Sequence, residues 1–149
     1  FGILQSYPHE IWAKTYGSSL GVGHRYTPTD CLQTFAMPAY GGEFKNFCKD
    51  FTNRRLEIMT AHRIGFTSLY NKINDPDSCE GYVNAIRSLH QELDRLVFSL
   101  FGWDDISARR VFIKVASGDK TSTEYSFPDD VKREIIRRLL ALNKEQSTL

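Results

Sequence analysis

The chain has 149 residues, 41% of them hydrophobic and 13% aromatic, which is enough for the core of one globular domain and excludes a disordered composition. The formal net charge is +1, so the overall charge does not indicate a nucleic-acid, membrane or acidic partner, and any electrostatic signal has to be local. No apolar run approaches the roughly 20 residues that a membrane span needs, and we expect no membrane partner.

Three cysteines lie far apart, at Cys31, Cys48 and Cys79, and form no C-x-x-C pair. Their odd number and wide spacing argue against a disulfide framework and a zinc site, so we expect reduced, buried thiols. The chain begins at Phe1, without an initiating methionine or the basic region of a signal peptide. We therefore expect it to be part of a longer cytosolic polypeptide.

The first predicted element is a short helix that ends at Gly17, because Ile11 and Trp12 follow the candidate N-cap Ser6 at helical spacing. Residues 18–38 are punctuated by glycines and prolines, which predicts mostly loop. Loops held on a rigid scaffold often carry recognition residues.

Three helices are predicted in the middle of the chain. The first covers residues 44–62, where apolar side chains recur at steps of three and four. A shorter helix covers residues 67–73 and stops before Pro76, because proline disfavours helical geometry in the residue before it. The third runs over about residues 79–101, with Gly102 as its C-cap.

A β-hairpin and a last helix complete the prediction. Residues 110–115 are rich in Val, Ile and Phe, residues 117–119 are typical of a turn, and residues 121–127 alternate. Pro128 can occupy the first turn of a helix whose positive end is favoured by the two aspartates that follow. The predicted fold class is therefore mainly α with a small β-hairpin (α+β), in which a loop-rich segment precedes a helical, bundle-like C-terminal region.

Charge is distributed unevenly along the middle of the chain. Residues 43–72 contain six Lys or Arg and three acids, whereas residues 73–105 contain seven acids and two arginines. One explanation is that a basic and an acidic helix face each other or solvent. The functional explanation is a set of phosphate-backbone contacts by side chains one or two turns apart, namely Arg54, Arg55, His62 and Arg63.

The sequence shows no recognisable catalytic constellation. No nucleophile stands with a base, no metal-ligand spacing is evident, and the Gly21-Val22-Gly23 run lacks the third glycine of a dinucleotide fingerprint. His9 and His90 lie near apolar stripes and are expected to pack in the core with their hydrogen bonds satisfied. We expect no catalytic, cofactor-binding or metal-binding residue in this chain.

Four segments, in order and spacing, resemble the end of one enzyme family. They carry the patterns Phe1-Gly2-Ile3-Leu4-Gln5-Ser6 with His9 and Trp12, "R-Y-T-P-T" leading to "T-F-x-x-P" in residues 25–38, "L-Y-N" in residues 65–76, and "L-H-x-x-x-D" with "G-W" in residues 89–103. Nearly the whole chain is similar to the C-terminal region of large restriction-modification methyltransferases of the MmeI-like type and of related phage-defence adenine methyltransferases. One departure is Phe35-Ala36-Met37-Pro38, where the family usually has "F-P-F-P".

The resemblance implies adenine-N6 methylation with S-adenosylmethionine, performed elsewhere in the parent enzyme, because the family's Asn-Pro-Pro-Tyr motif and glycine-rich cofactor loop are absent from these residues. It implies that residues 1–41 end the target-recognition domain and that residues 42–149 form the helical C-terminal region. The implied partners are double-stranded DNA and the catalytic domain of the same polypeptide. The implied location is the cytoplasm of a bacterium or archaeon.

Recognition can be carried by a module without the chemistry, because base flipping needs the duplex to be held while the adenine enters a separate pocket. The expected DNA-binding residues are Ser18, Ser19, His24, Arg25, Thr27, Arg54, Arg55 and Arg63. Arg25 would donate two hydrogen bonds to guanine, or would instead form a salt bridge that pins the loop. Asp94 is expected to be the partner of a helix cap or an arginine, and Tyr70 and Trp103 to anchor the core.

The alternative function is a helical protein-protein interaction module of a phage-defence complex. In that hypothesis the acidic helix at residues 79–101 docks onto another domain or subunit. An exposed apolar patch of several hundred Å² would favour docking, because monomers seldom show one. A basic groove on a well-covered surface would favour DNA.

Overall fold

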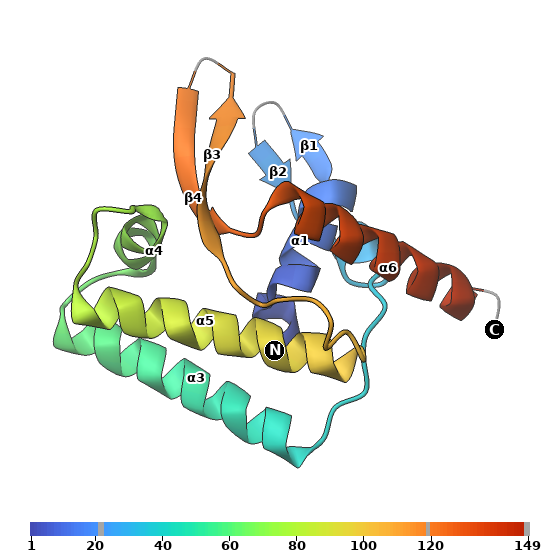
Figure 1. Ribbon diagram of the computed structural model, residues 1–149, viewed down its shortest axis with the longest axis horizontal. Helices are drawn as coiled ribbons and strands as arrows, with labels where there is room; N and C mark the ends of the chain where they lie inside the picture. The colour runs from blue at the N-terminus through green and yellow to red at the C-terminus, as the bar shows by residue number, and fades with distance from the viewer. Residues whose placement is uncertain (21–22, 119, 148–149) are drawn as a thin grey trace.

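The computed structural model describes residues 1–20, 23–118 and 120–147. It shows a mainly helical fold with small antiparallel hairpins, which confirms the predicted fold class. Figure 1 shows α3 and α5 side by side, with α6 crossing α1 on the other side of the molecule. The elements in chain order are η1 (Ile3–Gln5), α1 (Tyr7–Tyr16), β1 (Ser18–Leu20), β2 (Gly23–Arg25), α2 (Pro28–Cys31), α3 (Gly42–Ala61), α4 (Phe66–Asn74), α5 (Gly81–Leu100), β3 (Val111–Ser117), β4 (Lys120–Ser126) and α6 (Asp129–Ser147).

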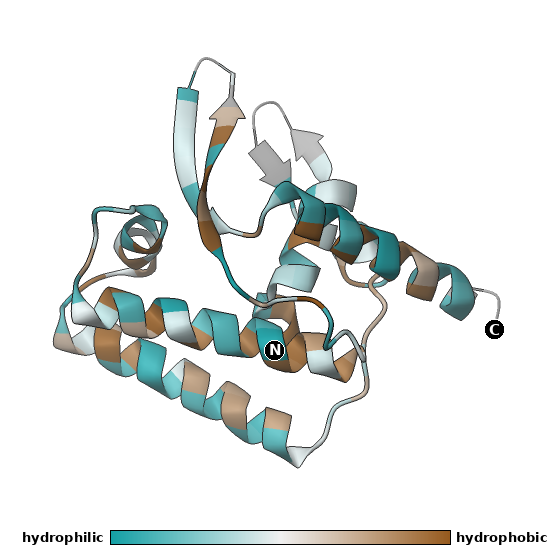
Figure 2. Cartoon of the chain, in the orientation of Figure 1, coloured by the Kyte–Doolittle hydropathy of each residue, from teal (hydrophilic) through white to brown (hydrophobic). Residues whose placement is uncertain are grey.

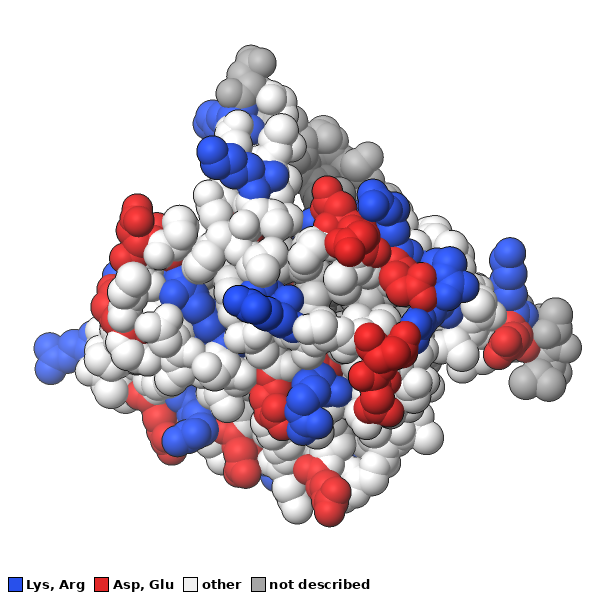
Figure 3. All heavy atoms as spheres, viewed as in Figure 1, with Lys and Arg blue, Asp and Glu red and all other residues white. Residues whose placement is uncertain are grey.

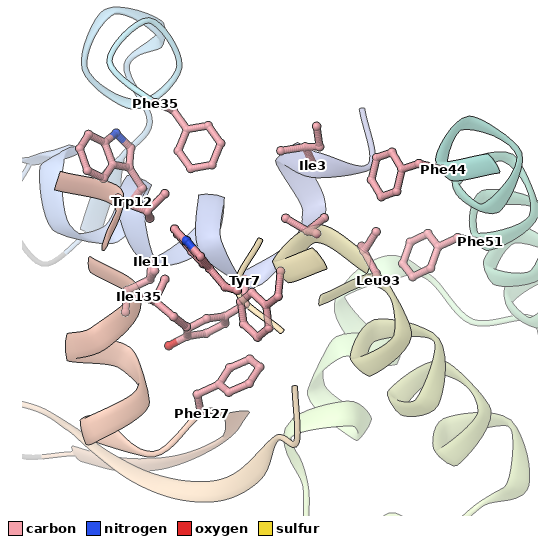
Figure 4. Packing of buried hydrophobic residues seen from close by; sticks show 14 residues of the cluster. Ile3, Tyr7, Ile11, Trp12, Phe35, Phe44, Phe51, Leu93, Phe127 and Ile135 are labelled. Atoms are coloured by element: carbon pink, nitrogen blue, oxygen red, sulfur yellow. The ribbon is translucent and has the colours of Figure 1, made fainter. Parts of the chain in front are cut away.

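Helix α1 lies in the core, where its side chains meet residues from most other elements. Tyr7 packs on Phe127 with ring centroids 4.6 Å apart, and Trp12 meets Phe35 edge-on. The same hydrophobic cluster extends to Ile135 of α6 (Figure 4). This cluster contains residues from both expected segments, 1–41 and 42–149, so the two segments share one hydrophobic core. The DNA-recognition role of the first segment and the packing role of the second stay predictions.

The helices predicted from periodicity in the middle of the chain are confirmed, with ends that differ by one or two residues. Apolar residues at helical spacing let α5 bury one continuous face, including Val83, Ile86 and Leu93. Gly102 follows the C-cap of α5 with a φ of 71°, the left-handed region that favours glycine.

The prediction of mostly loop for residues 18–38 was wrong in part. Strands β1 and β2 pair antiparallel, with Ser18 opposite Arg25, and α2 follows. Three-residue strands are too short to show a period of two in the sequence. Gly17 permits the hairpin, because a Cβ there would lie 2.5 Å from the Ala13 carbonyl oxygen and 3.0 Å from that of Arg25.

The predicted hairpin at residues 110–127 is confirmed as β3 and β4, in a register that pairs Val111 with Ser126 and Ser117 with Lys120. Gly118, in its turn, has a φ of 59°. Figure 2 shows hydrophobic residues along β3 and mostly hydrophilic residues along β4. The hairpin packs against α4, where the Tyr125 amide donates a hydrogen bond of 3.0 Å to the Asn74 side-chain oxygen.

The three thiols lie in different surroundings. Cys31 is buried, Cys48 is half-buried and Cys79 is exposed, each as a free cysteine. The expectation of buried thiols was therefore wrong for Cys79, which lies in the connection between α4 and α5.

A fully buried carboxylate joins three elements. Asp94 of α5 accepts a hydrogen bond of 2.7 Å from the Tyr7 amide at the start of α1, and its other oxygen accepts one of 2.8 Å from Nε of Arg110 and lies 2.8 Å from Nη2 of the same guanidinium. This confirms the expectation that Asp94 is the partner of a helix start or an arginine. Burial raises the pKa of the Asp94 carboxyl, and the guanidinium of Arg110 opposes that rise. The pair stays ionised, because a neutral carboxyl would leave the permanently charged Arg110 buried without a partner.

We predict that Asp94→Asn lowers the free energy of unfolding by about 3–5 kcal/mol, since it leaves a buried guanidinium without its counter-charge. Urea denaturation measures the change. Glu92→Gln is the matched control on the same helix, because Glu92 forms an exposed pair with Arg95, and such pairs contribute about 1 kcal/mol or less. Equal losses in the two variants would contradict the role given to Asp94.

Candidate functional site

A cleft of about 600 Å³ opens between α1, β2, α3, α4, α5 and β4. Its lining combines aromatic and aliphatic side chains with many polar and charged ones. The charged side chains in the lining are four cations and two carboxylates, namely Lys14, Arg25, Arg55, Arg110, Glu10 and Glu124.

The two carboxylates of the cleft share one lysine, so these three groups together carry one net negative charge. Lys14 Nζ lies 2.8 Å from a Glu10 oxygen and 3.5 Å from a Glu124 oxygen. Arg110 is neutralised by Asp94. Within the described residues no carboxylate lies within 4 Å of Arg25 or Arg55, so these two arginines supply the positive charge that the cleft leaves unpaired.

A hydrogen-bonded chain of side chains forms one wall of the cleft. Arg55 Nη1 donates to Gln5 Oε1 at 2.6 Å and to the Tyr70 hydroxyl at 3.0 Å, and that hydroxyl lies 3.1 Å from His90 Nε2. Tyr70, expected to be a core anchor, therefore places its hydroxyl in a polar network at the cleft. The expected core anchor Trp103 is buried and stacks on Phe101.

His90 is a buried histidine, as expected, but its hydrogen bonds are only half satisfied. Its ring meets Phe51 edge-on, and its Nδ1 has no hydrogen-bond partner among the described residues. Burial, followed by the nearby charges of Arg110 and Arg55, lowers the pKa of His90 to about 3. The imidazole is therefore neutral at physiological pH.

Exposed aromatic rings stand at the mouth of the cleft. Tyr26 is 49% exposed, and its hydroxyl lies 3.3 Å from Nε2 of the buried His9. Phe66 is 56% exposed and lies nearly parallel to Tyr70. Exposed ring faces beside arginines are suited to stacking on a planar ligand such as a nucleobase.

The structure brings three of the sequence-predicted DNA-binding residues close to this cleft. Arg25 and Arg55 both line it, although they are 30 positions apart in the sequence. Ser18 is exposed and is the cross-strand partner of Arg25 at the base of the β1–β2 hairpin. No ion pair holds Arg25 to the rest of the described chain, so the salt-bridge explanation of its role has no support in the described geometry.

The other predicted DNA-binding residues lie elsewhere. Arg54 is exposed on α3, and Arg63 is exposed just after that helix, so neither lines the cleft. The Thr27 hydroxyl donates a hydrogen bond to Asp30 at the start of α2. Ser19 and His24 are cross-strand partners in the β1–β2 hairpin, and the structure describes their backbone but not their side chains.

Sequence reasoning missed several residues of the site, notably Gln5, Tyr26 and Phe66. Gln5 bonds Arg55 across 50 positions of sequence, and no spacing rule connects residues that far apart. The sequence offered one hint of a binding role for the two aromatic residues. Phe66 follows Gly65 and Tyr26 follows Arg25, both outside the predicted helices.

The acidic surplus at residues 73–105 does not form an acidic helix. Helix α5 itself carries two arginines and two acids, of which Asp94 is buried and Glu92 pairs with Arg95. The remaining acids precede or follow α5. Figure 3 shows basic and acidic side chains intermixed over one face of the molecule, with basic ones near the far end of the β3–β4 hairpin.

Comparisons with known proteins do not identify the chain. No protein-family model, curated protein or solved structure matches it. In the part of the chain that the structure describes, no group of three or more His, Cys, Asp or Glu residues could hold a metal ion. Over the same residues, no helix combines the length and the apolar character needed to cross a membrane.

We predict that acid destabilises the protein through His90. Burial lowers the pKa of His90 in the folded state below its unfolded value of 6.5. Below pH 6.5 the imidazole is therefore protonated in the unfolded chain but still neutral in the folded chain, so protonation favours unfolding. The free energy of unfolding should fall by about 2 kcal/mol through this group from about pH 7 to about pH 5. Urea denaturation of His90→Gln at both pH values should show a decrease in the free energy of unfolding that is smaller than the wild-type decrease by that amount. The same decrease in both proteins would assign the acid effect to another group.

Proposed function

We propose that this chain is the DNA-recognition and helical C-terminal part of an adenine-N6 DNA methyltransferase. The single observation that supports it most is the cleft in which Arg25 and Arg55, without carboxylate partners among the described residues, stand beside exposed aromatic rings. Unpaired cations with aromatic faces have the chemistry that binds phosphate and base together. The family resemblance of the sequence adds the class of enzyme.

The two hairpins suit a grip on duplex DNA. A two-stranded β-ribbon fits into the major groove, where an arginine can donate two hydrogen bonds to guanine. Arg25 is exposed at the end of β2, and both hairpins project in the same direction in Figure 1. The longer hairpin carries exposed Lys114 and Lys120, side chains of the kind that contact backbone phosphates.

In this proposal the bond-making groups belong to another part of the parent polypeptide. The methyl donor S-adenosylmethionine and the catalytic motif would lie in the methyltransferase domain, onto which the helical region packs. That division of labour is consistent with base flipping, which separates the grip on the duplex from the pocket that receives the adenine. The host would be a bacterium or an archaeon, with the enzyme in its cytoplasm.

The protein-interaction alternative has less support. It needs an acidic helix face, and α5 is neutral over its length, with its one buried acid engaged by Arg110. A positively charged cleft is the feature that the DNA hypothesis needs and the docking hypothesis does not.

We predict that the 149-residue chain binds duplex DNA with an affinity that falls steeply as salt rises, because phosphate contacts release counterions. Fluorescence anisotropy with a labelled duplex at several salt concentrations measures the slope. Binding without any salt dependence would contradict the proposal.

We further predict that Arg25→Ala weakens sequence preference more than total affinity, by about 1–3 kcal/mol of discrimination at one base pair. Selection from a randomised duplex pool measures the preference. Arg95→Ala is the matched control, since Arg95 is exposed, pairs with Glu92 and does not line the cleft. The same loss of preference in both variants would show that Arg25 reads no base.

A further inference from the structure

Among the described residues three arginine side chains are almost fully buried, and in two of them every guanidinium nitrogen has a partner. Arg87 is 7% exposed and donates to the carbonyl oxygens of Ile73, Lys72 and Asp75 at the end of α4, where the helix dipole is negative. The Arg110 side chain is 8% exposed and pairs with Asp94 through two of its nitrogens. Each of these guanidinium groups therefore has a structural task that fully accounts for its burial.

Arg55 differs from both. It is 6% exposed, and its only hydrogen bonds to described residues run from Nη1 to two neutral oxygens, those of Gln5 and Tyr70. No carboxylate of the described residues lies within 4 Å of it. Donors left without acceptors make a buried guanidinium costly, and this distinguishes Arg55 from Arg87 and Arg110.

The geometry around Arg55 leaves one edge of the guanidinium available. The guanidinium carbon lies over the Phe51 and Phe66 rings, 5.1 Å from each ring centroid, so packing against both restricts its movement. A guanidinium has five N–H donors, and Nη1 uses two of them. The Nε and Nη2 donors, the pair that forms a two-pronged bond to an oxyanion, have no acceptor among the described residues.

We infer that the Nε–Nη2 edge of Arg55 is a preformed binding site for a phosphate oxyanion that enters the cleft. Arg55 lines this cleft, and the exposed Phe66 ring that covers it supplies a face on which a base next to that phosphate can stack. Arg25, the other unpaired cation of the lining, adds to the attraction for an anion. The anion site stands on this geometry alone, whereas naming a nucleic-acid strand as the source of the phosphate rests on the proposed function.

Thermal unfolding with inorganic phosphate, compared with sodium chloride at equal ionic strength, tests the site. A specific site raises the unfolding temperature of the wild type by about 3–6 °C at a phosphate concentration ten times the dissociation constant. Arg55→Met should lose this rise, and without phosphate it should unfold at no lower temperature than the wild type, because it removes an unpaired buried charge. A wild type that responds to phosphate no more than to chloride, or an Arg55→Met protein that keeps the rise, would overturn the inference.

Two further comparisons keep the test decisive. Lys49→Met removes one exposed cation from the same helix and should keep the phosphate response in full. If Arg55→Met does not fold, Arg55→Lys keeps the charge but lacks the two-donor edge, and its apparent affinity for phosphate should fall at least about tenfold. An unchanged affinity in Arg55→Lys would overturn the site, and stabilisation by acetate but not by phosphate would overturn its assignment to phosphate.

Duplex DNA separates the site from the proposed function. If the phosphate comes from a nucleic-acid strand, Arg55→Met should reduce the steepness of the salt dependence of duplex binding by about 0.9, the share of one phosphate contact. A phosphate response that depends on Arg55 in a protein that binds no duplex would support the anion site and refute the DNA function. Duplex binding that is unaffected by Arg55→Met, together with no phosphate response, would support the DNA function and refute the site.

Discussion

The fold depends on one buried carboxylate. Asp94 of α5 holds the first amide of α1 and the guanidinium of Arg110, which precedes β3, so a single side chain fixes the positions of three elements. Arg110 in turn lies over the Tyr7 and Phe127 rings, 5.5 and 5.7 Å from their centroids. Because a charged pair in the interior is tolerated only with close and well-directed hydrogen bonds, these elements have little freedom to shift relative to one another.

The same constraint determines the charge of the cleft. Arg110 lines the cleft but is neutralised by Asp94, and Lys14 is shared by two glutamates, which together leave one net negative charge. The positive charge that remains comes from Arg25 at the hairpin and Arg55 beneath Phe66. One kind of side chain thus serves as a helix cap at Arg87, as an ion-pair partner at Arg110 and as an unpaired cation at Arg55, and only the surroundings differ.

The cleft joins the two segments that the resemblance assigns to different roles. Arg25 comes from the segment expected to recognise DNA, whereas Arg55 and Phe66 come from the helical region. A ligand in the cleft would therefore contact both segments, which share one hydrophobic core. In the proposed function the helical region and the β1–β2 hairpin would contact DNA together, and their shared core gives a physical basis for that.

The sequence by itself determined the long helices, the β3–β4 hairpin, the C-cap at Gly17 and the glycine that follows the C-cap of α5, because periodicity and turn chemistry are local properties of the chain. It also indicated that Asp94 has a structural partner. Only the tertiary structure decided that β1 and β2 pair, that Cys79 is exposed, and that Arg55 is buried while its neighbour Arg54 is not. The burial of Arg55 involves a contact with Gln5, 50 positions away, which no local pattern encodes, and β1 and β2 are too short to show a period of two.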